Sequence, residues 1–235
     1  MSACRWCMLL LCCWVMPVQA ALDAGPSLGS ETLAPYVDYW CDGTGESGLD
    51  DALQATVTPL NKKQIAFSYR DDACWFRFRL RNGADVGHEV LLTVDYALLD
   101  YVDLYALEDN QTRHWQLGDM TLFGQRPLAL RNATVPLYLP ALSEREYWLR
   151  VMSTSSMTVP LTVASRDAFI EHHVNNDWLL GVFYGIGFGL FCYHLVLWVA
   201  ARERIYRFYV AHVGASLVYI ATLQGISQRL WPDGQ

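Results

Sequence analysis

The chain has 235 residues, of which 53% are hydrophobic and 17% are charged. This balance is too apolar for an ordinary soluble domain and is typical of a globular part joined to membrane helices. Between residues 21 and 177 there are 12 Lys and Arg against 22 Asp and Glu, and this net charge of −10 excludes nucleic acid as a partner.

The first 20 residues have the pattern of a secretory signal peptide. Arg5 precedes an apolar run from Cys7 to Val15, Pro17 follows as a helix breaker, and Ala20 supplies a small residue for cleavage. The apolar run is too short for a retained membrane anchor. We therefore expect cleavage after Ala20 and export of the domain that follows.

The exported part reads as a short linker followed by a β domain. Residues 21–32 are small, polar and prone to turns, and we interpret them as the linker. Residues 33–168 contain short alternating runs rich in Val, Leu, Tyr, Phe and Thr, which begin at residues 65, 74, 88, 101, 133, 147 and 158. This spacing predicts an all-β sandwich and argues against βαβ units.

Alternation within these runs assigns a core face, because neighbouring side chains on a strand point to opposite sides of the sheet. The predicted core face consists of Cys74, Phe76, Phe78, Leu80, Val90, Leu92, Val94, Val102, Leu104, Val135, Leu137, Leu139, Tyr147, Leu149 and Val151.

The opposite face is rich in aromatic and arginine side chains and has two interpretations. It could be a ligand platform, because sugars stack on aromatic rings and arginines bind hydroxyls or acids. It could equally be a packed second face with cross-strand ion pairs and arginines over rings. The candidate ligand-binding residues are Trp75, Arg77, Arg79, Tyr101, Asp103, Tyr105, Trp148 and Arg150.

Cysteine usage leaves one pair in the exported domain. Four of the seven cysteines lie in the signal peptide and Cys192 lies in an apolar segment, so Cys41 and Cys74 remain. In an oxidising compartment these two are candidates for a disulfide. Two separate buried thiols are the alternative.

A long apolar segment from Trp178 to Ala201 contains no Asp, Glu, Lys or Arg. As a helix it would be about 36 Å long, enough to cross a hydrocarbon core of about 30 Å. It follows a juxtamembrane segment, residues 169–177. Glycines at positions 181, 185, 187 and 189 allow close approach of a neighbouring helix, so we expect packing against further transmembrane helices or a partner subunit.

The residues after this span predict its orientation. Residues 202–207 carry three arginines and one Glu, which is typical of a short cytoplasmic loop. A second apolar stretch, residues 208–226, would return the chain to the outer side, where residues 227–235 form a tail. The β domain and the loop therefore lie on opposite sides of the membrane.

The residues that could carry chemistry do not form a recognisable catalytic or metal motif. Glu171, His172, His173 and Asp177 read as a solvated segment before the membrane, and the run DGTGESGLDD from Asp42 lacks the spacing of a twelve-residue calcium loop. There is no nucleophile elbow, phosphate loop or zinc signature. We expect no catalytic residues, no metal site and no cofactor.

Several longer motifs resemble a known family. The runs CWFRFRLRN, DYALLDYVDLYALED and YWLRVMSTSSMTVPLTV resemble the periplasmic type-2 domain of bacterial seven-transmembrane receptors with diverse intracellular signalling modules. The segment GVFYGIGFGLFCYHLVLWVAARERIYRFYVAHV is similar to the start of that family's seven-helix region. The residues on the family's pattern are Trp75, Arg77, Asn82, Asp100, Asp103, Tyr105, Gly118, Asp119, Arg126, Arg150 and Ser153.

The resemblance implies a jelly-roll sandwich similar to carbohydrate-binding modules, and sensing of a small molecule, such as a carbohydrate, rather than catalysis. It places the chain in the bacterial inner membrane with its sandwich in the periplasm. A diguanylate cyclase or histidine kinase output is expected downstream, beyond these residues. A membrane-anchored jelly-roll glycan hydrolase and a periplasmic adaptor for a protein partner are the alternatives.

Overall fold

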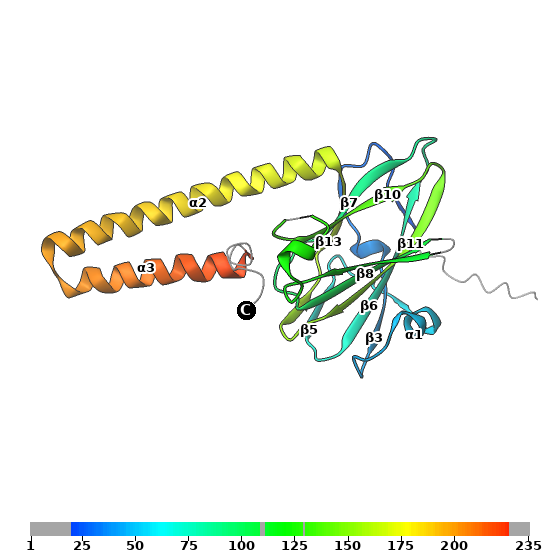
Figure 1. The fold of residues 1–235 in the computed structure, drawn as a ribbon, viewed down its shortest axis with the longest axis horizontal. Helices are drawn as coiled ribbons and strands as arrows, with labels where there is room; N and C mark the ends of the chain where they lie inside the picture. The colour runs from blue at the N-terminus through cyan, green and yellow to red at the C-terminus, as the bar shows by residue number, and fades with distance from the viewer. Residues whose placement is uncertain (1–19, 109–110, 129, 226–235) are drawn as a thin grey trace, which may run out of the picture.

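The computed structural model describes residues 20–108, 111–128 and 130–225. Two sheets face one another, and a helical hairpin extends from one end of the pair (Figure 1). The predicted signal peptide up to residue 19 and the predicted outer tail lie outside the described residues.

The larger sheet has seven described strands in the order β4-β3-β6-β11-β8-β9, with β1 paired to β6. Strand β6 is the centre, because β3 and β11 run antiparallel on its two sides. The bounds are β1 Leu22–Asp23, β3 Asp38–Asp42, β4 Thr58–Pro59, β6 Ala73–Asn82, β8 Tyr101–Glu108, β9 Gln111–Leu117 and β11 Ser143–Met152.

The smaller sheet has four described strands in the order β10-β7-β13-β2, all antiparallel. A further pair, β5 and β12, lies beside the sandwich as a two-stranded ribbon. The bounds are β2 Ser30–Thr32, β5 Ala66–Tyr69, β7 His88–Val94, β10 Ala133–Leu139, β12 Ser156–Thr158 and β13 Leu161–Ser165, and short helices occur at η1 Ala34–Tyr36, α1 Leu49–Gln54 and η2 Phe123–Gln125.

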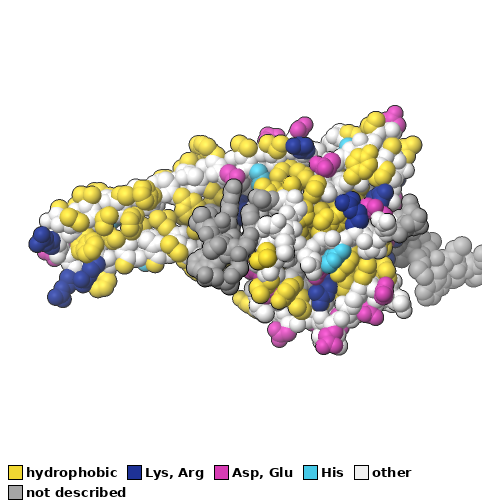
Figure 2. Space-filling model, in the orientation of Figure 1, with side chains coloured by type: hydrophobic (Ala, Val, Ile, Leu, Met, Phe, Trp, Pro, Cys, Tyr) yellow, Lys and Arg dark blue, Asp and Glu magenta, His cyan; other side chains and the backbone are white. Residues whose placement is uncertain are grey.

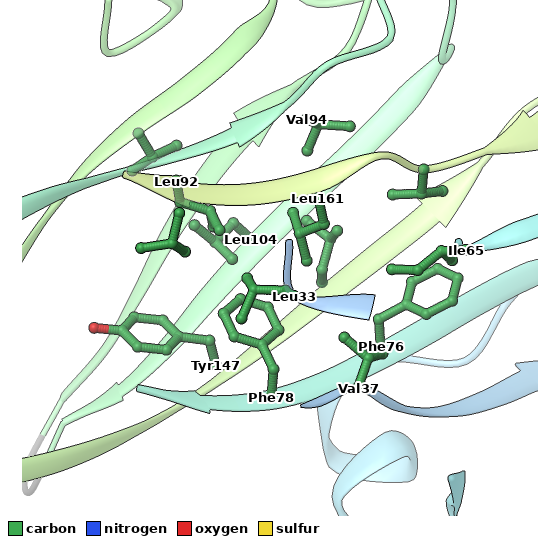
Figure 3. Close-up of a cluster of buried hydrophobic side chains, with 14 of the residues drawn as sticks. Leu33, Val37, Ile65, Phe76, Phe78, Leu92, Val94, Leu104, Tyr147 and Leu161 are labelled. Atoms are coloured by element: carbon green, nitrogen blue, oxygen red, sulfur yellow. The ribbon is translucent and has the colours of Figure 1, made fainter. Parts of the chain in front are cut away.

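The core lies between the two sheets, and every residue of the predicted core face is buried in it. Phe76, Phe78 and Tyr147 come from the larger sheet, and Leu92 and Leu161 approach them from the smaller one (Figure 3). The prediction of a β-sandwich and of its inward face is therefore confirmed. Alternation succeeded because each strand buries one complete face.

The predicted linker is part of the sandwich. Strand β1 pairs in parallel with β6, and β2 pairs with β13. Three small or aliphatic residues of this segment, Leu22, Ala24 and Leu28, are buried. Too few residues pair in each strand to produce an alternating pattern, which is why the sequence reads as a linker.

The helical hairpin consists of α2, Arg166–Ala201, and α3, Arg204–Leu223. Helix α2 begins before the predicted span because the Ser165 hydroxyl accepts a hydrogen bond from the Ala168 amide, so the juxtamembrane segment is helical. Arg202 adopts a left-handed conformation that ends α2, and α3 starts two residues later. The predicted loop, residues 202–207, is thus shorter than expected.

Within the described part of the chain, α2 is the one helix that is long and apolar enough to cross a membrane. Helix α3 does not meet that criterion, and the second span over residues 208–226 stays a prediction. Hydrophobic side chains cover the hairpin, and basic side chains gather at its far tip, where the sequence has Arg202, Arg204 and Arg207 (Figure 2).

Of the glycines expected to admit a neighbouring helix, Gly187 does so. A Cβ at this position would lie 2.6 Å from the Leu217 side chain of α3. The other three, at positions 181, 185 and 189, have open space at the same point. The glycine-rich surface of α2 is therefore only partly used by α3.

Cys41 and Cys74 form a disulfide that joins β3 to β6 across a paired position of the sheet. Cys74 is completely buried in the main core. The bridge closes a loop with a sequence separation of 33, and this loop contains α1.

Replacing both cysteines with serine should lower the free energy of unfolding by about 3 to 4 kcal/mol, because the unfolded chain regains the entropy of the open loop. Urea unfolding of the full chain in detergent, followed by far-ultraviolet circular dichroism, measures this loss. Cys192→Ser is the control, since Cys192 is a free thiol. Maleimide labelling of Cys41 and Cys74 in the denatured, unreduced protein would contradict the bridge.

Candidate functional site

The predicted aromatic and arginine-rich face forms one side of the larger sheet. On adjacent strands, Trp148 lies opposite both Arg77 and Tyr105. Two residues further along β11, Arg150 lies opposite both Trp75 and Asp103. Strand order therefore brings together residues whose neighbours the sequence alone could not assign.

Most of this face is covered. Trp75 is fully buried and Trp148 is 2% exposed, and both belong to a second hydrophobic cluster. Leu49 and Ala52 of α1 are part of that cluster, so the short helix lies against the two tryptophans. Buried rings cannot stack on a ligand from solution, and these two candidate residues act structurally.

The arginines of the same face are held by carboxylates. The Arg77 guanidinium lies 2.5 Å from the Asp38 carboxylate, and Arg79 Nε lies 2.8 Å from Glu146. Arg77 also lies over the Trp148 ring, 5.9 Å from its centroid. This arrangement corresponds to the packed second face that the sequence left open as an alternative.

The face opens at the β8–β9 edge, where Tyr101 is 43% exposed. A pocket of about 260 Å³ lies there. Its lining combines one aromatic ring, one carboxylate, two amides, a hydroxyl and aliphatic surface, and it consists of Tyr101, Val102, Asp103, Gln116, Leu117, Met120, Thr121, Leu122 and Gln125. Tyr101 and Asp103 are the only two of the eight candidate residues among the described lining residues.

The Asp103 carboxylate is fixed by two partners on neighbouring strands. His114 Nε2 lies 2.9 Å from one carboxylate oxygen, and Arg150 approaches the other at 3.5 Å. Arg150 also donates to the Gly45 carbonyl at 2.8 Å. The carboxylate is thus held at a fixed orientation at the edge of the pocket.

Tyr105 supports this arrangement from the next position on the same face of β8. Its ring stacks on the His114 imidazole with the centroids 4.4 Å apart, and on Trp75 at 5.7 Å. Burial raises the pKa of the Tyr105 phenol, the Asp103 charge raises it further, and Arg150 opposes this. Tyr105 therefore packs between His114 and Trp75 and does not line the pocket.

A tight turn at Gly118 directly follows Leu117, which lines the pocket. Gly118 has φ +96°, and a Cβ there would lie 2.5 Å from the Asp100 carbonyl oxygen. Arg126 donates to the Gly118 carbonyl at 2.6 Å. The turn therefore fixes where β9 leaves the pocket.

Asp119 follows this turn directly. Burial, together with the neighbouring Asp100 charge, raises the pKa of the Asp119 carboxyl, while Arg126 opposes this.

Asp100 ties the same turn to a second loop. Its carboxylate accepts hydrogen bonds from the Thr154 amide at 2.6 Å and from the Thr154 hydroxyl at 2.8 Å. Asp100, Gly118 and Arg126 thus organise the backbone beside the pocket.

Several pocket residues had no signal in the sequence. Gln116 lies on β9, a strand whose outward side chains are polar and whose run QTRHWQL shows no hydrophobic alternation. Thr121 and Gln125 lie in the following turn and η2. Their proximity to Tyr101 depends on the pairing of β8 with β9, which the sequence does not reveal.

The other polar clusters do not gather around a cation. Among the described residues, no group of three or more His, Cys, Asp or Glu side chains could hold a metal ion. In the run that starts at Asp42, the carboxylate accepts from its own loop, at 2.9 Å from the Thr44 amide and 2.8 Å from the Ser47 amide. Burial favours a higher pKa for Asp42, but these hydrogen bonds outweigh it and the pKa is lowered.

These features define a class: a β-sandwich with a solvent-facing pocket, joined directly to a helix that is long and apolar enough to cross a membrane. Family comparison agrees. The model described as "7TMR-DISM extracellular 2" matches residues 34–165, and that described as "7TM diverse intracellular signalling" matches residues 176–235. The chain belongs to this family of transmembrane sensory receptors, as its sequence motifs predict.

Solved structures with some similarity include two family 35 carbohydrate-binding modules. The module of Abf62 from Cellvibrio japonicus is 13% identical, with 40% of this chain and 64% of that chain covered and a TM-score of 0.24. The module from Clostridium thermocellum is 9% identical, with 58% and 98% covered and a TM-score of 0.29. These scores carry no argument about function. The comparison with curated proteins finds no match.

Two substitutions separate the buried part of the face from its open edge. Trp148→Ala should cost about 3 to 5 kcal/mol of stability, because it empties a buried site beneath α1. Tyr101→Ala should cost less than about 1 kcal/mol, because Tyr101 is 43% exposed and belongs to neither hydrophobic cluster. Thermal and urea unfolding of the full chain in detergent measures both. Equal losses in the two variants would contradict this division of the face.

Proposed function

We propose that this chain is the periplasmic ligand-sensing domain and membrane anchor of a bacterial receptor in the inner membrane. The sandwich recognises a small hydroxylated molecule, carbohydrate being the favoured class, and the helices transmit its binding to an output such as a diguanylate cyclase or a histidine kinase. The chain itself has no enzymatic activity. Family membership supports the sensory role, and the pocket at Tyr101 and Asp103 supports the ligand class.

The chemistry of the pocket carries this proposal. A sugar presents hydroxyls that both donate and accept, and apolar C–H faces that pack on aromatic rings. Asp103 accepts only, whereas the amides of Gln116 and Gln125 both donate and accept. The exposed Tyr101 ring and the Met120 side chain supply the apolar surface. The pocket volume of about 260 Å³ suits one or two sugar rings, and a larger glycan would extend out of the pocket into solvent.

Binding should depend on the open edge and not on the buried face. We expect a saccharide from a screen of neutral and acidic mono- and disaccharides to bind the full chain in detergent, measured by isothermal titration calorimetry. Tyr101→Ala should weaken binding by about tenfold, corresponding to about 1.4 kcal/mol. Tyr69→Ala is the matched control, because Tyr69 is 78% exposed on β5, outside the pocket.

Three outcomes would count against the proposal. If Tyr101→Ala bound the saccharide with the same affinity as wild type, the pocket would not be the binding site. Release of reducing sugar in a parallel hydrolysis assay would favour a glycan hydrolase. If no saccharide bound, and wild type captured a periplasmic protein that Tyr101→Ala did not capture, the adaptor function would be favoured.

The proposed orientation has its own test. Because Arg202, Arg204 and Arg207 gather at the tip of the hairpin, the positive-inside rule places that tip in the cytoplasm. A single cysteine introduced at Glu203, in a chain with Cys192→Ser, should resist a membrane-impermeant maleimide in intact spheroplasts and react after lysis. A cysteine at Ser27, in the sandwich, is the control and should react before lysis.

A further inference from the structure

A second cavity lies where the helical hairpin meets the sandwich, away from the pocket at Tyr101. Its volume is about 380 Å³. The sandwich contributes residues 95–97 and residues 131–132, and the helices contribute Asn176, Leu179, Leu180, Leu223 and Gln224. Both helices therefore line it with the ends that face the sandwich.

This cavity lies at the outer boundary of the predicted membrane span. The uncharged segment of α2 begins at Trp178, whose ring is 70% exposed, as expected for an amphipathic side chain at the lipid interface. Asn176 lies just before this boundary, and Leu179 and Leu180 lie just after it. The cavity thus has a polar wall from the sandwich and an apolar wall from the helices, next to the residue at which the predicted span begins.

The polar wall carries one cation and one carboxylate. Arg131 and Asp95 both line the cavity, and within the described part of the chain neither forms an ion pair. The carboxylate accepts a hydrogen bond from the amide of Asn132, which is 5% exposed. The buried Asn132 amide therefore fixes the Asp95 carboxylate. Among the described residues, Arg131 and Asp95 have no ionic partner of their own, and they are available to a ligand.

Arg131 is also held in place by its backbone. Its carbonyl accepts from the Arg126 guanidinium at 3.4 Å. A Cβ on Gly225, directly after α3, would lie 3.4 Å from the Arg131 side chain and 2.7 Å from Ala97. The end of the hairpin thus packs on both loops that carry the charges, and it closes the cavity on one side.

We propose that this cavity binds the headgroup of a zwitterionic phospholipid with a primary ammonium group. The Arg131 guanidinium binds the phosphate, the Asp95 carboxylate binds the ammonium, and the acyl chains follow Leu179, Leu180 and Leu223 into the bilayer. An arginine and a carboxylate that line one cavity, next to an apolar wall, match such a headgroup and match neither a neutral sugar nor an anionic lipid as well. The site is independent of the saccharide pocket.

The test uses the full chain, delipidated in detergent, with three probes followed by native mass spectrometry. Dioctanoyl phosphatidylethanolamine carries both charges and tails, dioctanoyl phosphatidylglycerol lacks the ammonium, and glycerophosphoethanolamine lacks the tails. We expect the first to bind most tightly. Arg131→Gln should weaken it by about tenfold or more through loss of a charge-assisted bond. Arg81→Gln, an exposed arginine on β6, is the control and should bind as wild type does.

Asp95→Asn tests the ammonium partner separately. It keeps the shape of the side chain and removes its charge, so the preference for phosphatidylethanolamine over phosphatidylglycerol should fall to about one. An unchanged preference in this variant would overturn the assignment of Asp95. Equal binding of glycerophosphoethanolamine and the lipid would overturn a lipid site in favour of a soluble phosphate ester.

A second pair of variants tests the cavity without touching its charges. Asn176→Trp places a bulky ring into the cavity from an exposed position of α2. Asn175→Trp adds the same ring one residue earlier, about 100° around the helix, where it does not line the cavity. The first should displace the lipid and the second should not. Equal lipid binding in both, or in Arg131→Gln and wild type, would overturn the proposal.

Discussion

The structure depends on the pairing of β6 with β11, which bury one face in the main core and part of the other, at Trp75 and Trp148, beneath α1. Their pairing runs from Asn82 opposite Ser143 to Cys74 opposite Val151. On one side Phe76 and Phe78 enter the main core, and on the other Trp75 packs beneath α1. A slip of one residue would turn Arg77 and Arg79 into the main core without their carboxylate partners, so the register is fixed by the cost of burying unpaired charge.

The pocket at Tyr101 and Asp103 lies where the cover of α1 ends. Helix α1 covers the tryptophans near β6 and β11 but leaves the β8–β9 edge open, so Tyr101 and Asp103 reach solvent there. The turn at Gly118 packs directly on the Asp100 backbone, and the loop before Asp100 contacts the end of the helical hairpin at Ala97. The pocket, one connecting loop and the helical hairpin are therefore physically continuous. Packed residues in contact of this kind carry energetic coupling between separate sites.

Particular residues show why the strands were predictable and the site was not. Strands β6, β7, β8, β10 and β11 each bury alternate side chains in one core, and this requirement is written directly into their sequences. Strand β9 is an edge strand with mostly exposed polar residues, so it shows no such pattern. Trp75 and Tyr101 belong to the same predicted face, yet one is fully buried and the other is 43% exposed. The difference arises from α1, whose six residues carry no long helical period.

The sequence by itself determined the sandwich, its inward face, the apolar helix that follows it and the membership in a family of transmembrane receptors. Each of these depends on local order along the chain: hydrophobic periodicity, an uncharged run or a continuous motif. Tertiary structure alone decided strand order, the covering of Trp75 and Trp148, and the meeting of Tyr101 with Gln116 or of Arg131 with α2. The physical reason is that exposure and proximity are set by which element packs over which, and residues far apart in the chain carry no local record of that packing.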